Sequence, residues 1–256
     1  AVEGGSAVAD DALSVTAANA GTITAEVENT VIVSSISIGS SEDEKAISVA
    51  PIVTLNRVAS GAVANVVEAG ELRSNDGSIT VSAADMAAIR AEVLAASASV
   101  SLNLGSGKSL SFAIAASIAR NQIDAIVDAA ILSTGTDAAP VSAAAGGVSV
   151  LAFQNATIEA IVRAVAASVS VGGGGAFGAS GGGAISANSI QGSTTARLID
   201  SVVQASAVAV DAQSLAAIDA DVLAAAVTAS GGLDNTTAVA VGLSIADNTI
   251  GFGTVE

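Results

Sequence analysis

The chain contains no cysteine and no histidine, and these two absences exclude several kinds of chemistry. Without cysteine it cannot form disulfides, thiol nucleophiles or iron–sulfur clusters. Without histidine it lacks the usual zinc sites, the serine–histidine triads and the most common general base. We therefore expect a protein that is not an enzyme and that holds no cofactor.

Large side chains are also scarce, although the chain is strongly apolar. Apolar residues make up 51% of the 256 positions and the mean hydropathy is +0.69, which excludes intrinsic disorder as the main state. Yet the chain has four phenylalanines, no tryptophan and no tyrosine, beside 26 glycines. Because alanine and glycine supply little volume, this composition favours layers that approach closely over a thick core.

Basic residues are few, since 8 lysines and arginines face 24 acids and the net charge is −16. Such a surface is a poor partner for nucleic acid or for an anionic membrane, and it favours solubility. The uncharged run of residues 164–196 is long enough to cross a bilayer. Glycine clusters at residues 172–175 and 181–183 interrupt it, so we expect no membrane insertion.

Internal repetition is the most informative feature of the sequence. Four segments of alternating apolar residues begin at Leu13, Ile79, Val148 and Val208, and each is followed by Ile-x-Ala-x-Val and then by [Ile/Val]-x-x-Asn-x-[Ile/Val]. The intervals between the starts are 60 to 69 residues. The predicted organisation is the tail of an earlier unit at 1–12, then units at 13–78, 79–147, 148–207 and 208–256, the last incomplete. We expect a portion of a longer array, or a subunit that continues end to end into its neighbour.

The alanine-rich stretches, such as residues 84–95, have the composition of helices, but the first unit alternates β-branched residues as a strand does. Parity favours strand. In each unit the conserved isoleucine (Ile23, Ile89, Ile158, Ile218) is followed by an apolar residue that serine or alanine flanks (Ile36, Val100, Val169, Val227). The four gaps between these two residues are all odd and differ in steps of two. In a strand such changes leave both residues on the same faces in every unit, whereas in a helix they would rotate one residue relative to the other.

Each unit is predicted to contain a short strand at its start, a long strand around the conserved isoleucine, a third strand ending at the asparagine signature and a fourth before a variable loop. Polar or glycine-rich turns are expected between the second and third strands, at residues 39–45, 105–109, 172–183 and 230–236. Small residues on both strand faces favour an all-β solenoid resembling a parallel β-helix, with several rungs per unit. The alternative is a string of small antiparallel β-sandwiches, which normally have aromatic cores.

The alternation of Ala, Ser, Val and Gly, with Ser-Ile-Ala-x-Asn-x-Ile recurring near every 60 residues, resembles the tandem repeats of large secreted bacterial surface proteins of the filamentous-adhesin, haemagglutinin-like and leukotoxin type. The resemblance implies a secreted or surface-displayed filament, β-solenoid in fold and non-enzymatic. Separately, because the bare ends of a solenoid are unpaired edges, we expect the chain to associate with itself or with neighbouring repeats, and we expect host or cell-surface glycans as further partners. The chain departs from this pattern in having no secretion domain and no Ca²⁺-binding Gly-Gly-x-Gly-x-Asp nonapeptide.

The repeated asparagine (Asn56, Asn121, Asn188, Asn248) is the best single feature, and we expect a structural role in which it turns a corner or stacks with itself in an amide ladder. The alternative is that its amide contributes to a ligand or ion site. Acids are weak candidates for Ca²⁺ ligands, which would make a Ca²⁺-dependent carbohydrate-binding or carbohydrate-active β-helix the alternative function. One group is the predicted loop acids Glu42, Asp43 and Glu44. The other follows the asparagine signature at inconstant intervals of 12, 7 and 12 residues, at Glu68, Asp128 and Asp200.

Overall fold

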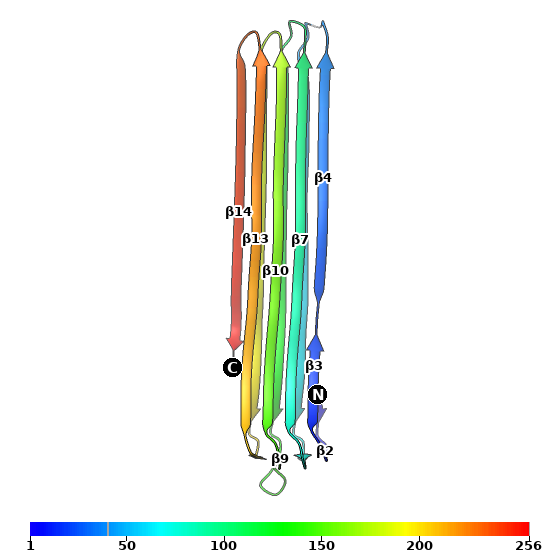
Figure 1. Ribbon diagram of the computed structural model, residues 1–256, viewed down its shortest axis with the longest axis vertical. Helices are drawn as coiled ribbons and strands as arrows, with labels where there is room; N and C mark the ends of the chain where they lie inside the picture. Colours follow the sequence, from blue (N-terminus) through cyan, green and yellow to red (C-terminus); the bar gives the residue numbers. More distant parts are fainter. Residues whose placement is uncertain (40, 256) are drawn as a thin grey trace.

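The chain folds into one β-solenoid of long parallel strands, with no helix in the described residues (Figure 1). The computed structural model describes residues 1–39 and 41–255, with side chains described up to residue 251; Ser40, inside the first predicted turn, and Glu256, at the end of the last predicted unit, lie outside the described residues. The strands are β1 (Val2–Glu3), β2 (Ser6–Ala9), β3 (Leu13–Asn19), β4 (Thr22–Ser37), β5 (Glu44–Val67), β6 (Glu71–Ser74), β7 (Ile79–Asn103), β8 (Ser109–Leu132), β9 (Val141–Ala143), β10 (Val148–Gly172), β11 (Ala176–Ile199), β12 (Val203–Ala205), β13 (Val208–Gly232) and β14 (Thr236–Val255).

Three sheets form the walls of the solenoid. The front sheet contains β13, β10, β7 and then β3 and β4; the back sheet contains β1, β5, β8, β11 and β14; the base sheet contains β12, β9, β6 and β2. The chain climbs a front strand to a turn, which we call the tip, descends a back strand, and crosses the base sheet to the next front strand. Every pairing between described strands is parallel, so the alternative of antiparallel sandwiches is wrong.

Each repeat makes one coil of the solenoid, and the expectation of several rungs per unit is therefore wrong. The conserved isoleucines pair in one row, Ile23 with Ile89, Ile89 with Ile158 and Ile158 with Ile218. The reason is the strand length: β7 and β10 each run 25 residues without a break, so a 66-residue unit is used up by a single circuit.

The strand reading of the alanine-rich stretches is confirmed, and the parity argument holds in the structure. The conserved isoleucines point inward, with Ile89 and Ile158 buried, whereas Ile36, Val169 and Val227 lie on the outer face. These outer residues do not share a row, since Ile36 pairs with Leu102 and not with Val100. Parity therefore predicted correctly that the two residues of each unit lie on opposite faces of the sheet, but it did not predict which residues pair between coils.

The predicted strands are longer in the structure than in the sequence reading. The first and second predicted strands of a unit fuse into one front strand, and the third and fourth fuse into one back strand. Only the first unit keeps a break, between β3 and β4. The base strands, three or four residues long, lie in the piece read as a variable loop, where they are too short for alternation to reveal them.

The predicted turn at residues 172–183 is wrong over most of its length. The turn occupies residues 173–175, and Gly178, Gly181, Gly182 and Gly183 belong to β11. Gly178 and Gly182 point inward, and the opposite sheet explains why glycine occupies these two positions of the strand. A Cβ on Gly182 would lie 2.6 Å from the carbonyl oxygen of Ala225 in the front sheet. The two sheets are therefore in near backbone contact at this point.

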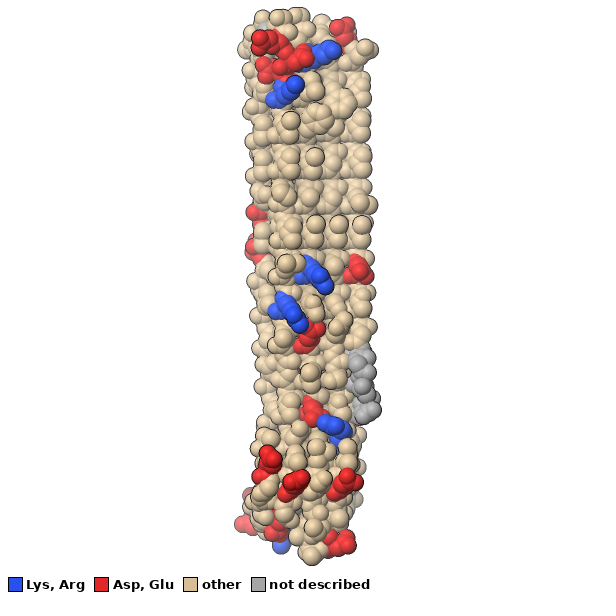
Figure 2. All heavy atoms as spheres, turned by 180° about the vertical axis from the view of Figure 1, so that it is seen from behind, with Lys and Arg blue, Asp and Glu red and all other residues tan. Residues whose placement is uncertain are grey.

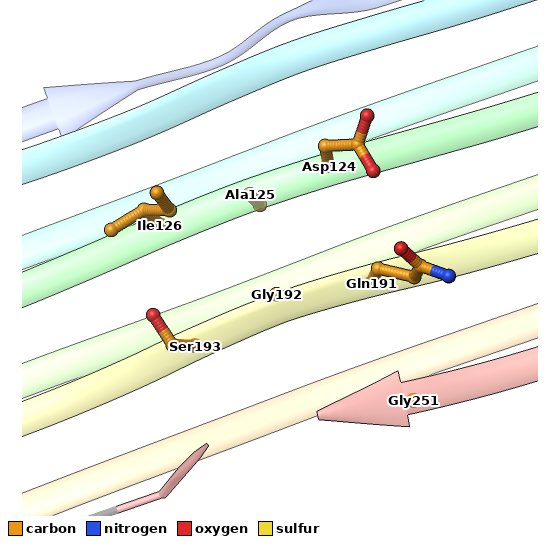
Figure 3. Close-up of a pocket in the computed structure, with 7 residues that line it drawn as sticks. All are labelled: Asp124, Ala125, Ile126, Gln191, Gly192, Ser193 and Gly251. Carbon is orange, nitrogen blue, oxygen red and sulfur yellow. The ribbon is translucent and has the colours of Figure 1, made fainter. Parts of the chain in front are cut away.

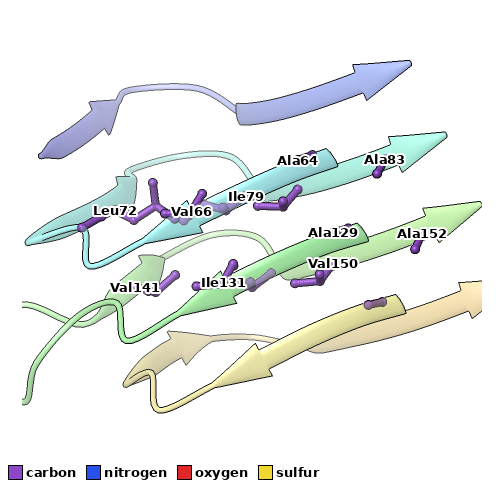
Figure 4. Close-up of a cluster of buried hydrophobic side chains, with 14 of the residues drawn as sticks. Ala64, Val66, Leu72, Ile79, Ala83, Ala129, Ile131, Val141, Val150 and Ala152 are labelled. Carbon is purple, nitrogen blue, oxygen red and sulfur yellow. The ribbon is translucent and has the colours of Figure 1, made fainter. Parts of the chain in front are cut away.

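The core narrows from the base towards the tip, and side-chain size follows it. Where three sheets enclose the interior, the buried residues are large aliphatics such as Val66, Leu72, Ile79 and Ile131 (Figure 4). Further up, between only two sheets, alanine alternates with single valines and isoleucines. This taper explains how a chain almost without aromatics fills its core.

Near the tip the interior is lined by serine. The Ser99 and Ser111 hydroxyls lie 2.7 Å apart across the two sheets, and Ser168 Oγ donates to the backbone oxygen of Ser111 at 2.9 Å. Ser170 Oγ likewise donates to the Ser109 oxygen at 2.8 Å. These buried hydroxyls are thus satisfied by the opposite sheet, which compensates for removing them from water.

Candidate functional site

The four repeated asparagines form a continuous amide ladder along the back sheet. Asn56 Nδ2 donates to Asn121 Oδ1 at 2.8 Å, Asn121 Nδ2 to Asn188 Oδ1 at 2.7 Å, and Asn188 Nδ2 to Asn248 Oδ1 at 2.8 Å. Parallel pairing in register brings the four side chains together, because each occupies the same inward position of its coil. Stacked amides of this kind satisfy one another only between identical positions, so the ladder selects the register.

The ladder has a direction and stops at two open edges. Among the described residues, Asn248 Nδ2 has no acceptor and Asn56 Oδ1 has no donor, while the three bonds between them all run the same way. The backbone is open at the same places. β14 has a partner only on its β11 side, and β5 is covered on its outer edge only at Val66 and Val67, by β1. Unpaired strand edges of this length are templates for another strand.

Ion pairs between neighbouring coils support the same register on the outer surface. Arg57, Arg90, Arg163 and Arg197 each contact an acid of the adjacent coil; the pairs are Arg57–Asp124 (2.8 Å), Arg90–Glu159 (2.8 Å), Arg163–Asp221 (3.0 Å) and Arg197–Asp128 (2.8 Å). Such exposed pairs contribute little to stability, about 0–1 kcal/mol each. Four of the eight basic side chains of the protein nevertheless form ion pairs with a neighbouring coil.

The first group of candidate Ca²⁺ ligands lies at the tip. Asp43 Oδ1 accepts a hydrogen bond from the Lys108 amide at 2.9 Å, and the backbone oxygen of Glu42 accepts one from Asn103 Nδ2 at 2.6 Å. Glu44 begins β5 and its carboxylate is bound by the Ser35 hydroxyl. Asp43 and the Glu42 backbone thus join the first tip turn to the next one, whereas Glu44 is held within its own coil.

The second group is not brought together. Glu68 and Asp200 occupy equivalent corners between the back and base sheets, where both have a positive φ and Ser133 takes the corner of the coil between them. Asp128 instead lies inside β8, where it contacts Arg197 and accepts from Asn65 Nδ2 at 3.1 Å. Among the residues described, no three or more acidic side chains gather as a metal-binding group. The inconstant 12, 7 and 12 spacing was the signal for this difference.

Chelation therefore provides a direct test of the weak Ca²⁺ proposal. We expect the melting temperature to be the same in EDTA and in added calcium chloride, because the acids are spread over separate corners and Asp128 is engaged by an arginine. A metal that bound only the folded chain would raise the melting temperature with its concentration. A calcium-dependent rise in a differential scanning calorimetry trace would restore the Ca²⁺-dependent alternative.

A solvent-open hollow of about 450 Å³ lies on the outer face of the back sheet (Figure 3). It is lined by Asp124, Ala125, Ile126, Gln191, Gly192, Ser193 and Gly251. Its one carboxylate, Asp124, accepts hydrogen bonds from the Arg57 guanidinium and from Gln122 Nε2. Glycoside hydrolysis needs two carboxyl groups facing one bond, and this lining supplies one that is already engaged.

The interior contains a cluster of buried polar side chains that was not predicted from the sequence. Asp85 is fully buried and accepts from Asn19 Nδ2 at 3.0 Å and from Ser60 Oγ at 2.8 Å, and the neighbouring Gln154 Oε1 accepts from Thr194 Oγ1 at 2.8 Å. The alternation shows only that position 85 faces inward. Because Asn19, Asp85 and Gln154 are different residue types in the same row, repeat comparison could not reveal the bond between Asn19 and Asp85 or the separate bond of Gln154 to Thr194.

Comparison with known protein families, with curated proteins and with solved structures gives no match, so the functional argument depends on this chain's own residues. No helix in the described part of the chain has the length and apolar character needed to cross a membrane.

Proposed function

We propose that the chain is a non-enzymatic structural unit of an extracellular bacterial surface filament, in which solenoid coils continue end to end from one unit into the next. The observation that carries the proposal is that both edges of the solenoid are open and complementary, in backbone and in the asparagine ladder. The acidic surface suits a dispersed, adhesive array, whose neighbours are other repeats and whose targets are surface glycans.

The register of the existing coils specifies how a second unit would dock. On the back sheet, the row that joins Thr236 to Ala176 and Ser109 continues to Glu44, so β14 of one unit would lie beside β5 of the next. The row through Val255 and Thr194 continues to Ala62, so the described residues of β14 would lie beside the part of β5 that β1 leaves open.

The front sheet continues in the same register. Val208 pairs with Val148, Val148 with Ile79 and Ile79 with Leu13, so β13 of one unit would lie beside β3 and β4 of the next. In this arrangement Asn248 Nδ2 would meet Asn56 Oδ1 of the following unit. The junction would thus repeat the bond that already joins each coil to its neighbour, whether the next unit is a separate chain or a further segment.

Asn248→Asp isolates this junction. The substituted carboxylate still accepts from Asn188 Nδ2 within the unit, but it has no amide proton for Asn56 of the next unit and would place a charge against an oxygen. We expect the variant to fold normally and to form shorter or no filaments, measured by negative-stain electron microscopy and by sedimentation velocity. Asn155→Asp is the matched control, because it adds the same charge on the outer face of β10.

The two variants separate the possible results. Filaments in the wild type and in Asn155→Asp, with their loss in Asn248→Asp, would support the proposal. Monodisperse wild-type protein at high concentration would contradict assembly by separate chains, and equal assembly of both variants would contradict the ladder junction.

A further inference from the structure

The outer face of the back sheet carries an uninterrupted apolar surface between two charged zones. In Figure 2 it is the tan area below the charged tip and above the charged middle of the molecule. Four rows across the sheet contain no polar side-chain atom, and we call these four rows the back belt. From the tip downwards the rows are Ile47, Phe112, Ala179 and Val239; Val49, Ile114, Gly181 and Val241; Pro51, Ala116, Gly183 and Leu243; and Val53, Ile118, Ile185 and Ile245.

The back belt is more exposed and more apolar than a soluble surface requires. Val53 is 64% exposed and Val241 61%. At this height the inward positions of β8 and β11 are serine, alanine or glycine, and Ile52 of β5 is an inward exception that belongs to the core. On these back strands the large apolar side chains thus lie mainly on the outer face, whereas a sheet protein usually places them inside. A contiguous apolar patch of this extent marks an interaction surface.

We propose that the back belt packs face to face against the back belt of a second copy of this chain, related by a twofold axis parallel to the strands. This lateral contact is separate from the end-to-end junction and does not depend on it. Four strands at about 4.8 Å and the roughly eight residues that four alternating rows span at about 3.3 Å give a plane of roughly 500 Å² on each copy. Together the two faces reach the roughly 1,000 Å² that a specific interface needs.

The shape of the back belt favours this axis. The β11 column is low at Ala179, Gly181 and Gly183 and rises at Ile185, and a Cβ on either glycine would meet no atom within 4 Å. The neighbouring β8 column is high at Phe112 and Ile114 and drops at Ala116. Rotation about an axis parallel to the strands places β8 of one copy over β11 of the other, so Phe112 and Ile114 of each copy enter the low positions Ala179 and Gly181 of the other. An axis across the strands would place β11 over β11 and leave a gap.

Charges at the lower margin of the back belt agree with the same axis, because it also places β5 over β14. β5 carries Arg57 below the belt, where it contacts Asp124 of its own unit, and Asp247 follows the belt on β14. This margin would therefore bring Arg57 of one copy near Asp247 of the other, which orients the pair. The upper margin does not select the axis, because Lys45 of β5 directly follows three acids, at residues 42–44.

A lipid bilayer fits these observations less well than a second copy does. Along the height of the belt, β5 and β14 each present an open row of backbone groups. In hydrocarbon each unpaired group costs several kcal/mol, whereas beside a second copy in water these edges stay hydrated or paired. A bilayer would also make no use of the fit between high and low columns.

The test compares two isoleucines of one strand and one face. Ile114→Glu places a charge in the centre of the back belt, and Ile126→Glu makes the same change 12 positions further along β8, outside it. With Asn248→Asp present to limit end-to-end growth, we expect Ile114→Glu to weaken the lateral dimer about tenfold or more in sedimentation equilibrium. Ile126→Glu should have little effect. Equal dimerisation of the two variants, or a monomeric parent at high concentration, would overturn the proposal.

Gly181→Leu distinguishes a fitted interface from general stickiness. It makes the belt more apolar but fills the low column, so the proposal expects weaker dimerisation, whereas adhesion driven by hydrophobicity alone would increase. Flotation with phosphatidylcholine vesicles provides the second readout. Vesicle binding that Ile114→Glu abolishes, or stronger dimerisation of Gly181→Leu, would overturn the fitted contact between copies. If the end-to-end proposal fails, filaments are lost but lateral pairs remain, and the reverse failure leaves single unpaired filaments.

Discussion

Gly182→Val and Gly183→Val should have opposite effects on stability, although the two residues are neighbours in one strand. An inward Cβ at position 182 would lie 2.6 Å from the Ala225 oxygen and 3.3 Å from the Ala164 oxygen, both in the backbone of the front sheet. These backbone atoms cannot move away from the added Cβ as the end of a flexible side chain can. For Gly182→Val we therefore expect a loss of about 3 kcal/mol or more in the free energy of unfolding.

At Gly183 the added Cβ would point outward and meet no atom within 4 Å. Valine there also restricts the unfolded chain and suits a strand, so we expect a gain of up to about 1 kcal/mol. Urea unfolding followed by circular dichroism, at concentrations where the chain is monomeric, measures both. Equal destabilisation by the two variants would show that the sheets are not in close contact at the tip.

The sequence was sufficient to predict the fold class because the repeats share their alternation. Odd gaps after Ile23, Ile89, Ile158 and Ile218 distinguish strand from helix whatever the local composition, and they show that the conserved residue and the following apolar residue point to opposite faces. The asparagine ladder was predictable for the same reason, since an identical inward residue in every coil must meet its copies once the strands run parallel.

The number of rungs could not be predicted, because alternation has no upper length. Nothing between Val81 and Val93 marks whether the strand breaks, and β7 passes without interruption through positions read as the end of one strand and the start of another. Glycine led to the opposite error, because a turn was predicted where the chain continues as a strand. In residues 172–183 it signals a turn by composition, but Gly178 and Gly182 are required by the opposite sheet, a constraint that sequence does not contain.

The back belt was also beyond sequence reasoning, for a related reason. The apolar alternation of Ile114 and Ile118 predicts which residues share a face, but not which face is inside. The other face contains serine, which is mostly exposed in proteins, and alanine, so beside isoleucine it would ordinarily be assigned to solvent as the less apolar face. Only the close approach of the two sheets, with Ser99 and Ser111 bonded across the interior, reverses that assignment.

Asn121→Ala should be among the most destabilising single substitutions in the back sheet. The side chain is fully buried, and it accepts from Asn56 Nδ2 and donates to Asn188 Oδ1. Alanine would leave a donor and an acceptor without partners in the interior, at about 1–3 kcal/mol each. We expect a total loss of about 3 kcal/mol in urea unfolding, because Asn56, at the open edge, recovers some hydration. Asn155→Ala, on the outer face, is the control and should change little.

Asn121→Asp tests whether the lost amide proton is the cause. The carboxylate can still accept from Asn56 but cannot donate to Asn188, and burial raises the pKa of such a group. A raised folded-state pKa means that the lost stability is recovered at low pH, where the protonated acid donates a hydrogen bond, and is lost as pH rises through that pKa. The difference in unfolding free energy between this variant and Asn155→Asp should therefore be small near about pH 4 and large at about pH 7. A difference independent of pH would mean that side-chain shape, and not the continuity of the hydrogen bonds, is what the ladder contributes.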